Sequence, residues 1–260
     1  MLTHFSLFSG IGGIDLAAEW AGFTTVGQVE WADYPTKVLE KHWPDVPRWR
    51  DIRSVTGDDV RARGIKEVTV LSGGFPCQPH SLAGKRKAST DERDLWPEYR
   101  RLISEIRPKW VVAENVRGLL TSENGRFFRG ILRDLSEMGF NVGWCCFPAA
   151  WVGAVHRRER IFTIAHAHSR TIQFMGIRKN NVQRGKKTEK WSEDWYKFEL
   201  DYGKVAPSKW REPGGSPQPF ICRKSDGVSN WMDRWRCLGN AVVPQQVYPI
   251  LKAIAEIETR

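Results

Sequence analysis

Short apolar runs alternate with segments of helical periodicity along most of this chain. Turn residues bound the apolar runs, which predict buried strands at 5–8, 24–29, 68–71, 110–113, 140–147 and 161–165. Apolar residues at three- and four-residue spacing predict helices at 14–20, 33–42, 94–106 and 124–138, and a last helix that begins near Pro244. Strands that alternate with helices are typical of an α/β fold with a mostly parallel sheet.

The pattern breaks at about 166–235. Periodicity disappears there, while Lys, Arg, Trp, Gly and Pro become more frequent. Either a disordered insert or a small irregular lobe gives this composition, and the tryptophans favour folded structure because disordered segments are poor in aromatic residues. We therefore predict a first domain at 1–165, a lobe at 166–235, and a C-terminal segment at 236–260 that returns to the first domain.

Composition narrows the class of protein. The formal charge is +10 over 260 residues, which favours a nucleic-acid partner, although a basic surface alone gives the same balance. Five cysteines without metal-ligand spacing predict reduced thiols in the cytosol and no zinc. The sequence has neither a signal peptide nor an apolar stretch of about 18 residues, so we predict no membrane association.

A glycine-rich turn, 9–13, follows the first predicted strand and leads into a helix. Such a turn brings backbone N–H groups and a helix N-terminus against a cofactor, but its spacing is not the dinucleotide fingerprint. Glu30 ends the second strand, where an acidic residue binds ribose hydroxyls, and Trp31 beside it could lie on an adenine ring. Asp51 and Ile52 could frame the same ring, but Asp51 could equally cap a turn. We predict an adenosine-containing cofactor.

Three further strand ends carry groups that suit catalysis. Cys77 follows Gly73, Gly74 and Pro76 on a loop, where neighbouring basic residues would favour the thiolate; a buried, inert cysteine is the alternative. Glu114 closes a core strand, where burial would raise its pKa, unless it only caps a turn. Arg158 and Arg160 alternate at strand spacing and would share a face, although most Arg clusters are solvated or bind phosphate.

In this order the segments resemble the DNA (cytosine-5) methyltransferases, in a compact bacterial or phage form. The stretches that carry the resemblance are Leu7 to Gly13, Glu30-Trp31, Asp51-Ile52, Gly73 to Gln78, Glu114-Asn115-Val116, Arg157 to Arg160 and Gly239 to Pro244. Three features depart from the family, the first being that no clear copy of the segment that normally follows the lobe is present. His156 stands where the family usually has Gln, and the lobe at 166–235 is short.

The resemblance implies a doubly wound sheet of the class I S-adenosylmethionine-dependent type. It implies that the cofactor is S-adenosyl-L-methionine, released as S-adenosyl-L-homocysteine. The residues that it places against this cofactor are Phe8, Gly10, Ile11, Gly12, Gly13, Glu30, Trp31, Asp51, Ile52, Pro76, Leu95, Asn240 and Ala241.

The same resemblance implies methyl transfer to carbon 5 of a cytosine flipped out of double-stranded DNA, through a covalent Cys77 adduct. Glu114, Arg158 and Arg160 would complete the catalytic set. The loop 81–94 would close over the base, and the residues predicted to contact DNA are Gln78, Ser81, Lys85 and Arg86.

The predicted partner is therefore duplex DNA, with no metal and no membrane, for a monomer in the cytoplasm of a bacterium or of a phage's host. Whether the protein has a cognate restriction endonuclease as a partner stays open. Two rival functions also stay open: a tRNA cytosine-5 methyltransferase of the same fold, and a catalytically silent DNA-binding relative.

Overall fold

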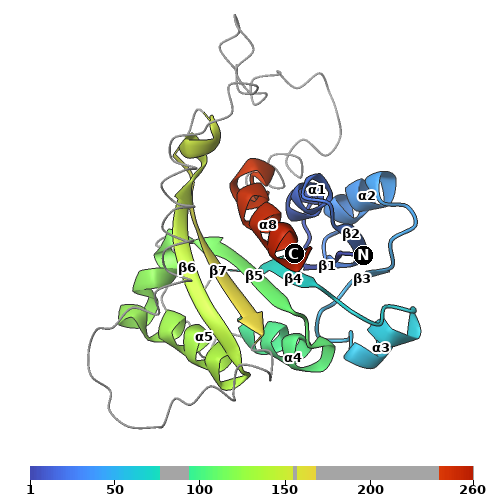
Figure 1. The fold of residues 1–260 in the computed structure, drawn as a ribbon, viewed down its shortest axis with the longest axis horizontal. Helices are drawn as coiled ribbons and strands as arrows, with labels where there is room; N and C mark the ends of the chain where they lie inside the picture. The colour runs from blue at the N-terminus through green and yellow to red at the C-terminus, as the bar shows by residue number, and fades with distance from the viewer. Residues whose placement is uncertain (77–93, 155–156, 168–239, 260) are drawn as a thin grey trace, which may run out of the picture.

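A single sheet organises the part of the chain that the computed structural model describes, residues 1–76, 94–154, 157–167 and 240–259. Seven strands form it there, in the order β3-β2-β1-β4-β5-β7-β6 (Figure 1). Their bounds are β1 Thr3–Leu7, β2 Thr24–Val29, β3 Arg48–Trp49, β4 Val70–Gly74, β5 Trp110–Val116, β6 Phe140–Pro148 and β7 Glu159–Ala167. All neighbours are parallel except β7, which runs antiparallel to both β5 and β6. The predicted doubly wound, mostly parallel α/β fold is confirmed.

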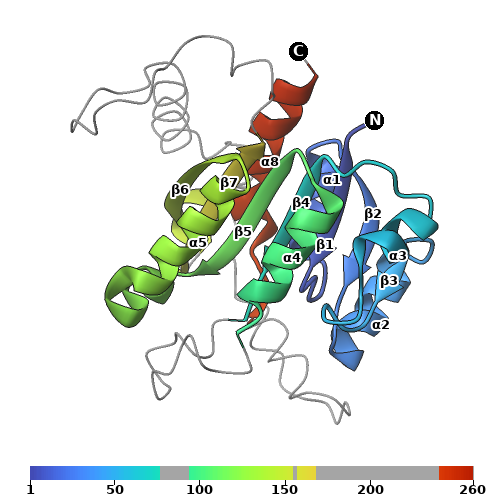
Figure 2. The ribbon, with the colours of Figure 1, turned by 90° about the horizontal axis from the view of Figure 1, so that it is seen from below.

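Helices cover both faces of the sheet (Figures 1 and 2). The described α-helices are α1 Gly13–Trp20, α2 Asp33–His42, α3 Gly57–Ala62, α4 Trp96–Ile106, α5 Arg126–Glu137 and α8 Pro244–Glu258. Side chains alternate along the central strands, as a doubly covered sheet requires. Leu71 and Val111 enter the core under α4 and α5, while Val70 and Val112 enter the core under α1 and α8.

The C-terminal helix packs against the first half of the chain. In α8, Ile250, Leu251 and Ile254 are buried in the same core as Ala17 and Ala18 of α1. This packing explains why a segment far away in the sequence reaches the glycine turn that precedes α1. The division at 166 and 235 stays a prediction, because residues 168–239 lie outside the described residues.

Most predicted elements lie where the periodicity indicates, with β2 and α2 matching to the residue. The helix predicted from Asn124 instead begins at Arg126, because Glu123 and Asn124, at the end of the preceding 3₁₀ segment Arg117–Gly125, have left-handed φ values of 49° and 55°. A second 3₁₀ turn, Ala149–Val152, follows β6. β5 extends beyond Ala113 to Val116 because β7 pairs with it, so Glu114 lies within the strand.

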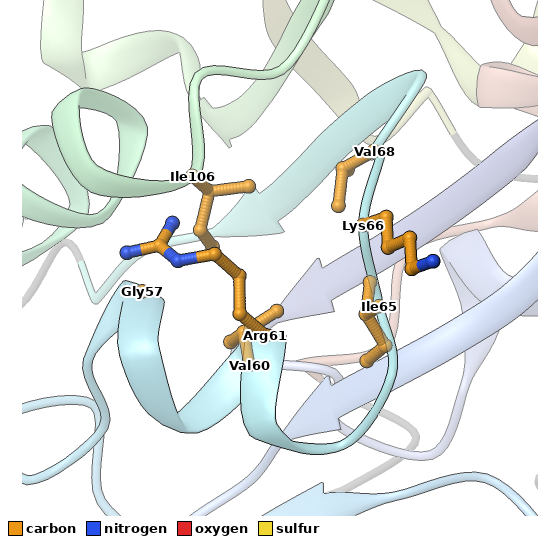
Figure 3. A pocket seen from close by; sticks show the side chains of 7 residues that line it. All are labelled: Gly57, Val60, Arg61, Ile65, Lys66, Val68 and Ile106. Carbon is orange, nitrogen blue, oxygen red and sulfur yellow. The ribbon is translucent and has the colours of Figure 1, made fainter.

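The carboxyl ends of β1, β2, β4 and β5 meet at one edge of the sheet, which is where open α/β sheets bind ligands. The hollow shown in Figure 3 does not lie at this carboxyl edge of the sheet. It is lined by residues of α3, the loop to β4 and the end of α4, among them Val60, Ile65 and Ile106. This hollow adjoins the amino ends of the strands and contains none of the predicted site residues. No helix in the described ranges is long and apolar enough to cross a bilayer.

Candidate active site

Glu114 is a buried carboxyl group in β5. Its Oε1 accepts a hydrogen bond from Arg160 Nε at 2.9 Å, and its side chain is only 10% exposed. Burial raises the pKa of Glu114 to about 7, and the nearby charges of Arg160 and then Arg158 offset part of that rise. A carboxyl group that retains its proton near neutral pH is suited to act as a general acid.

The backbone of β4 packs directly against this carboxyl group. A Cβ added to Gly74 would lie 2.7 Å from Glu114 Oε2, so only glycine leaves room for it. The neighbouring Asn115 donates from Nδ2 to the carbonyl oxygen of Phe75 at 3.1 Å. Together these contacts hold Gly74 and Phe75, the end of β4, beside Glu114 and Asn115.

Cys77 itself lies outside the described residues, which end at Pro76 before the gap. The same holds for Gln78, Ser81, Lys85, Arg86 and His156. Their predicted roles stay predictions.

Two arginines approach Glu114 from the start of β7. Arg160 lies in the strand, but Arg158 precedes it with a φ of 25°, so the strand alternation expected from the sequence does not extend to Arg158. Arg158 Nη2 instead donates to the carbonyl oxygen of Ala241 at 2.7 Å. The C-terminal segment thus orients Arg158, and both guanidinium groups stabilise negative charge on Glu114.

The glycine-rich turn has the shape of a cofactor cradle. Phe8, Gly10 and Gly12 all have positive φ values, of 52°, 56° and 84°. The N–H of Gly10 donates to Glu30 Oε2 at 2.7 Å, and the N–H of Ala32 donates to Oε1 at 2.8 Å. These two bonds fix the carboxylate while leaving acceptor capacity on both oxygens for ribose hydroxyl groups. The geometry fits an adenosine-containing cofactor.

The predicted adenine-binding residues follow β2 and β3, except Leu95, which precedes α4. The Trp31 ring is 66% exposed, and the Arg53 guanidinium lies 5.6 Å from its centroid. Asp51 Oδ1 accepts the backbone N–H of Arg53 at 3.0 Å, so the turn-capping alternative describes this residue correctly. The Arg53 side chain also binds Asp51 and lowers the pKa of that carboxyl group. Ile52 is buried in the core under α4, and Leu95, the residue before α4, packs against the same core.

The segment before α8 closes the turn from the other side. A Cβ on Gly13 would overlap the carbonyl oxygen of Val242, so the two backbones are in direct contact. This contact brings the segment that includes Ala241, the residue before Val242, close to the turn. Asn240 is exposed, and Ile11 is half-buried at the middle of the turn.

Four residues that support this site received no role from the sequence. In the sequence, Asn115 belongs to the Glu114-Asn115-Val116 motif without a role of its own. Asp15 is a single polar residue among apolar helix positions. Arg101 donates from α4 to the carbonyl oxygens of Ile52 and Val55 at 2.8 and 3.0 Å. Gln246 Nε2 donates to the carbonyl oxygen of Phe147 at 2.6 Å. No local pattern distinguishes the last two from ordinary helix residues.

Comparisons with known proteins agree with this geometry. The family model described as C-5 cytosine-specific DNA methylase matches residues 2–205. The type II methyltransferase M.BsuFI of Bacillus subtilis is 37% identical over 164 residues, 63% of this chain and 39% of that protein. M.NgoMIV of Neisseria gonorrhoeae, also a type II methyltransferase, is 34% identical over 184 residues, 70% of this chain and 57% of that protein. The chain thus spans well under two thirds of the length of these relatives.

Solved structures share the fold across the whole chain. The DNMT2 structure of Spodoptera frugiperda superposes with a TM-score of 0.63 at 17% identity, covering 98% of this chain and 100% of that one. The methyltransferase EhMeth of Entamoeba histolytica gives a TM-score of 0.65 at 14% identity, covering 100% and 99%. With a family match that covers most of its length, this chain belongs to the C-5 cytosine-specific DNA methylases.

Proposed function

We propose that this chain transfers a methyl group from S-adenosyl-L-methionine to carbon 5 of a cytosine flipped out of duplex DNA. The observation that carries the proposal is the buried pair of Glu114 and Arg160, with Nε to Oε1 at 2.9 Å, held against Gly74 just before Pro76 and Cys77. Membership of the family supports the substrate and the cofactor.

Glu114 and Arg160 would recognise and activate the base. A protonated Glu114 donates to ring nitrogen 3 of cytosine, and its second oxygen accepts from the exocyclic amine, which thymine lacks. Arg160 holds the carboxyl group in place and bonds the cytosine carbonyl oxygen. The raised pKa of Glu114, about 7, keeps enough of the acid form for this donation near neutral pH.

Cys77 would supply the nucleophile. Its thiolate forms a bond to carbon 6, and the ring electrons move toward nitrogen 3, where the Glu114 proton neutralises them. Carbon 5 thereby becomes nucleophilic. When bound, S-adenosyl-L-methionine supplies an electrophilic methyl group on a sulfonium. Once carbon 5 carries the methyl group, its proton leaves to solvent and the electrons of that C–H bond form the double bond between carbons 5 and 6. The bond from carbon 6 to sulfur breaks and releases the Cys77 thiolate, Glu114 recovers its proton from nitrogen 3, and the aromatic ring is restored.

The cofactor would lie along the carboxyl edge of β1, β2 and β4. Phe8, Gly10, Ile11, Gly12 and Gly13 would line its methionine end, with Glu30 on the ribose. The remaining contacts that we assign are those of Trp31, Asp51, Ile52 and Leu95 around the adenine, Pro76 beside the methyl group, and Asn240 and Ala241 over the turn. Because the Arg53 guanidinium lies near Trp31 and is bonded to Asp51, it would have to move for adenine to bind there.

Residues 166–235 would recognise the target site. Lys and Arg in this lobe would contact phosphates, with a few side chains reading base edges, while Gln78, Ser81, Lys85 and Arg86 would contact the flipped nucleotide and its strand. Because the relatives are type II methyltransferases, we also propose that a restriction endonuclease is a partner of this chain.

The test uses DNA that contains 5-fluorocytosine, incubated with the full chain and S-adenosyl-L-methionine. Fluorine cannot leave as a proton does, so the wild-type protein is expected to form a denaturation-resistant adduct through Cys77. The Cys77→Ser variant is expected to bind the cofactor normally but to form no adduct and no 5-methylcytosine.

Parallel reactions on unmodified duplex DNA and on tRNA separate the substrate classes, and bisulfite sequencing of DNA from expressing cells gives the target site. Methyl transfer by Cys77→Ser at the wild-type rate, or transfer to tRNA alone, would contradict the proposal. Cofactor binding without any transfer would favour the silent relative.

A further inference from the structure

Asp15 is a buried carboxyl group that the proposed chemistry does not use. It lies in the first turn of α1, two residues after the glycine turn ends, and it is 0% exposed. Burial is the largest cause that raises the pKa of Asp15, to about 6. A carboxyl group in such a place is costly unless hydrogen bonds stabilise it.

One oxygen of this carboxyl group collects two donors from neighbouring strands. Ser6 Oγ in β1 and Gln28 Nε2 in β2 each donate to Asp15 Oδ1 at 2.9 Å. Gln28 Oε1 in turn accepts from Arg48 Nε and Nη2 at 3.0 and 2.6 Å. Within the described residues, Asp15 Oδ2 has no hydrogen-bond partner. The contacts of Oδ1 therefore link α1 to β1, β2 and β3.

The same network reaches the glycine turn through Ser6. The Ser6 and Ser9 hydroxyl oxygens are 2.5 Å apart. When Ser6 gives its single hydroxyl proton to Asp15, its oxygen accepts from Ser9, whose hydroxyl also lies 3.3 Å from the carbonyl oxygens of Ser6 and Val29. Ser9 also donates its backbone N–H to the carbonyl oxygen of Val29 at 3.0 Å, and its own carbonyl oxygen accepts from Gly12 at 2.9 Å. The hydrogen bonds from Ser9 to Ser6 and from Ser6 to Asp15 thus hold Ser9 in place, and the carbonyl oxygen of Ser9 closes the turn by accepting from Gly12.

We propose that Asp15 is a positioning residue for the cofactor turn: through Ser6 and Ser9, its Oδ1 holds residues 9–13 in the shape that binds S-adenosyl-L-methionine. This inference rests on the proposed function. The property that matters is an acceptor at Oδ1 and not the negative charge, because both donors bind that one oxygen. Asparagine retains this acceptor and removes the charge, whereas alanine removes the acceptor.

Titration calorimetry of the full chain with S-adenosyl-L-methionine tests the inference. We expect Asp15→Ala to raise Kd about tenfold, the size of one lost buried hydrogen bond, and Asp15→Asn to stay within about threefold of wild type. Ser6→Ala should also raise Kd severalfold, and the double variant Ser6→Ala, Asp15→Ala should add little, since both changes break one chain of bonds.

A matched control separates positioning from general stability. Glu258 is another mostly buried carboxylate, 13% exposed, which accepts from the indole Nε1 of Trp110 at 2.9 Å near the opposite edge of the sheet. Glu258→Ala is expected to lower the melting temperature and to leave Kd unchanged. A rise in Kd equal to that of Asp15→Ala would overturn the inference.

The remaining outcomes are also decisive. An unchanged Kd in Asp15→Ala, or an Asp15→Asn variant as weak as Asp15→Ala, refutes the positioning role of the acceptor. If Asp15→Ala does not fold, Ser6→Ala decides, because it removes a single hydroxyl; an unchanged Kd there refutes the inference. Failure of the wild-type protein to bind the cofactor at all would instead contradict the proposed function.

Discussion

The proton on Glu114 connects the burial of a single residue to both stability and catalysis. Its folded pKa is raised to about 7 from 4.5, so the folded protein binds this proton more tightly than the unfolded chain. The contribution of Glu114 to stability is therefore greatest below the unfolded value and is lost as pH rises toward the folded one. Burial favours the protonated form of Glu114 in the folded protein, and this is also the form that would donate a proton to the cytosine.

Replacing Glu114 by Gln tests both consequences. We compare the unfolding free energy of the variant with that of wild type at each pH. Because wild type loses stability as Glu114 titrates and Gln does not titrate, this difference should shift by about 2–3 kcal/mol in favour of the variant between about pH 5 and about pH 8. Its kcat should fall roughly 10²–10⁴-fold, with unchanged cofactor Kd. Denaturant unfolding at several pH values and single-turnover methylation measure the two effects. A stability difference that does not vary with pH would contradict the raised pKa.

The close approach of Gly74 to Glu114 predicts a second residue-scale effect. In Gly74→Ala, the added methyl group would lie 2.7 Å from Glu114 Oε2, so the carboxyl group must shift away from the base. Because small misplacements of catalytic groups are costly, we expect kcat to fall about 10²-fold, with cofactor Kd unchanged.

The control for this substitution is Gly130→Ala in the middle of α5, where an added Cβ meets no atom within 4 Å. It should raise stability by about 0.5–1 kcal/mol and leave kcat unchanged, as expected for alanine in a helix. Equal losses of kcat in the two variants would show that crowding of Glu114 is not the cause.

Among the elements, α4 positions the loop that carries Asp51 and Ile52. Arg101 of α4 donates to the carbonyl oxygens of Ile52 and Val55, and its charge is balanced by Glu98 and Glu105 on the same helix. We expect Arg101→Met to leave both carbonyl oxygens without this donor. The expected cost is about 1–3 kcal/mol in unfolding free energy, with a severalfold rise in cofactor Kd.

Calorimetry and denaturant unfolding measure the Arg101 effect. Lys252→Met on α8 is the matched control, since Lys252 lies 4.0 Å from Glu256 in an exposed pair one helical turn apart. A change below about 0.5 kcal/mol is expected there. An unaltered Kd in Arg101→Met would mean that α4 does not hold the cofactor loop.

Local periodicity predicts the elements that carry their own core face, such as β2 and α2. It misses β3, two residues long, because that strand exists only through its pairing with β2. It also misses α3, although the capping box of Thr56 and Asp59 is readable in the sequence. The extension of β5 past Glu114 comes from antiparallel pairing with β7, a long-range contact that no window along the chain contains.

The sequence motifs predict the residues of the site better than they predict the hydrogen bonds that hold those residues in place. Glu114, Glu30 and the glycine turn meet at one sheet edge because parallel strands place their carboxyl ends together. Arg160 reaches the same edge from the amino end of β7, because that strand runs antiparallel to β5. The hydrogen bonds that hold them, from Asn115, Ser6 and Gln246, join residues far apart in sequence. Such partners are set by register and helix docking, which composition and spacing do not specify.

For the whole molecule, charge is distributed unevenly between the described fold and the predicted lobe. Residues 166–235 contain fourteen Lys and Arg against eight Asp and Glu, a net +6 of the chain's +10. The remainder of the chain is therefore close to balanced. This distribution favours the lobe as the part that contacts phosphates.

Salt dependence of duplex binding tests that assignment. Each phosphate contact contributes about −0.9 to the slope of log K against log salt, so replacing Lys186, Lys187 and Lys190 by Gln should reduce the slope by about 2–3. The matched triple replaces Arg63, Lys66 and Arg107, which are exposed near the amino ends of β4 and β5, and should leave the slope unchanged. Fluorescence anisotropy with one duplex at several salt concentrations measures both. If the two triples change the slope equally, binding follows the net charge of the molecule and the lobe has no special role.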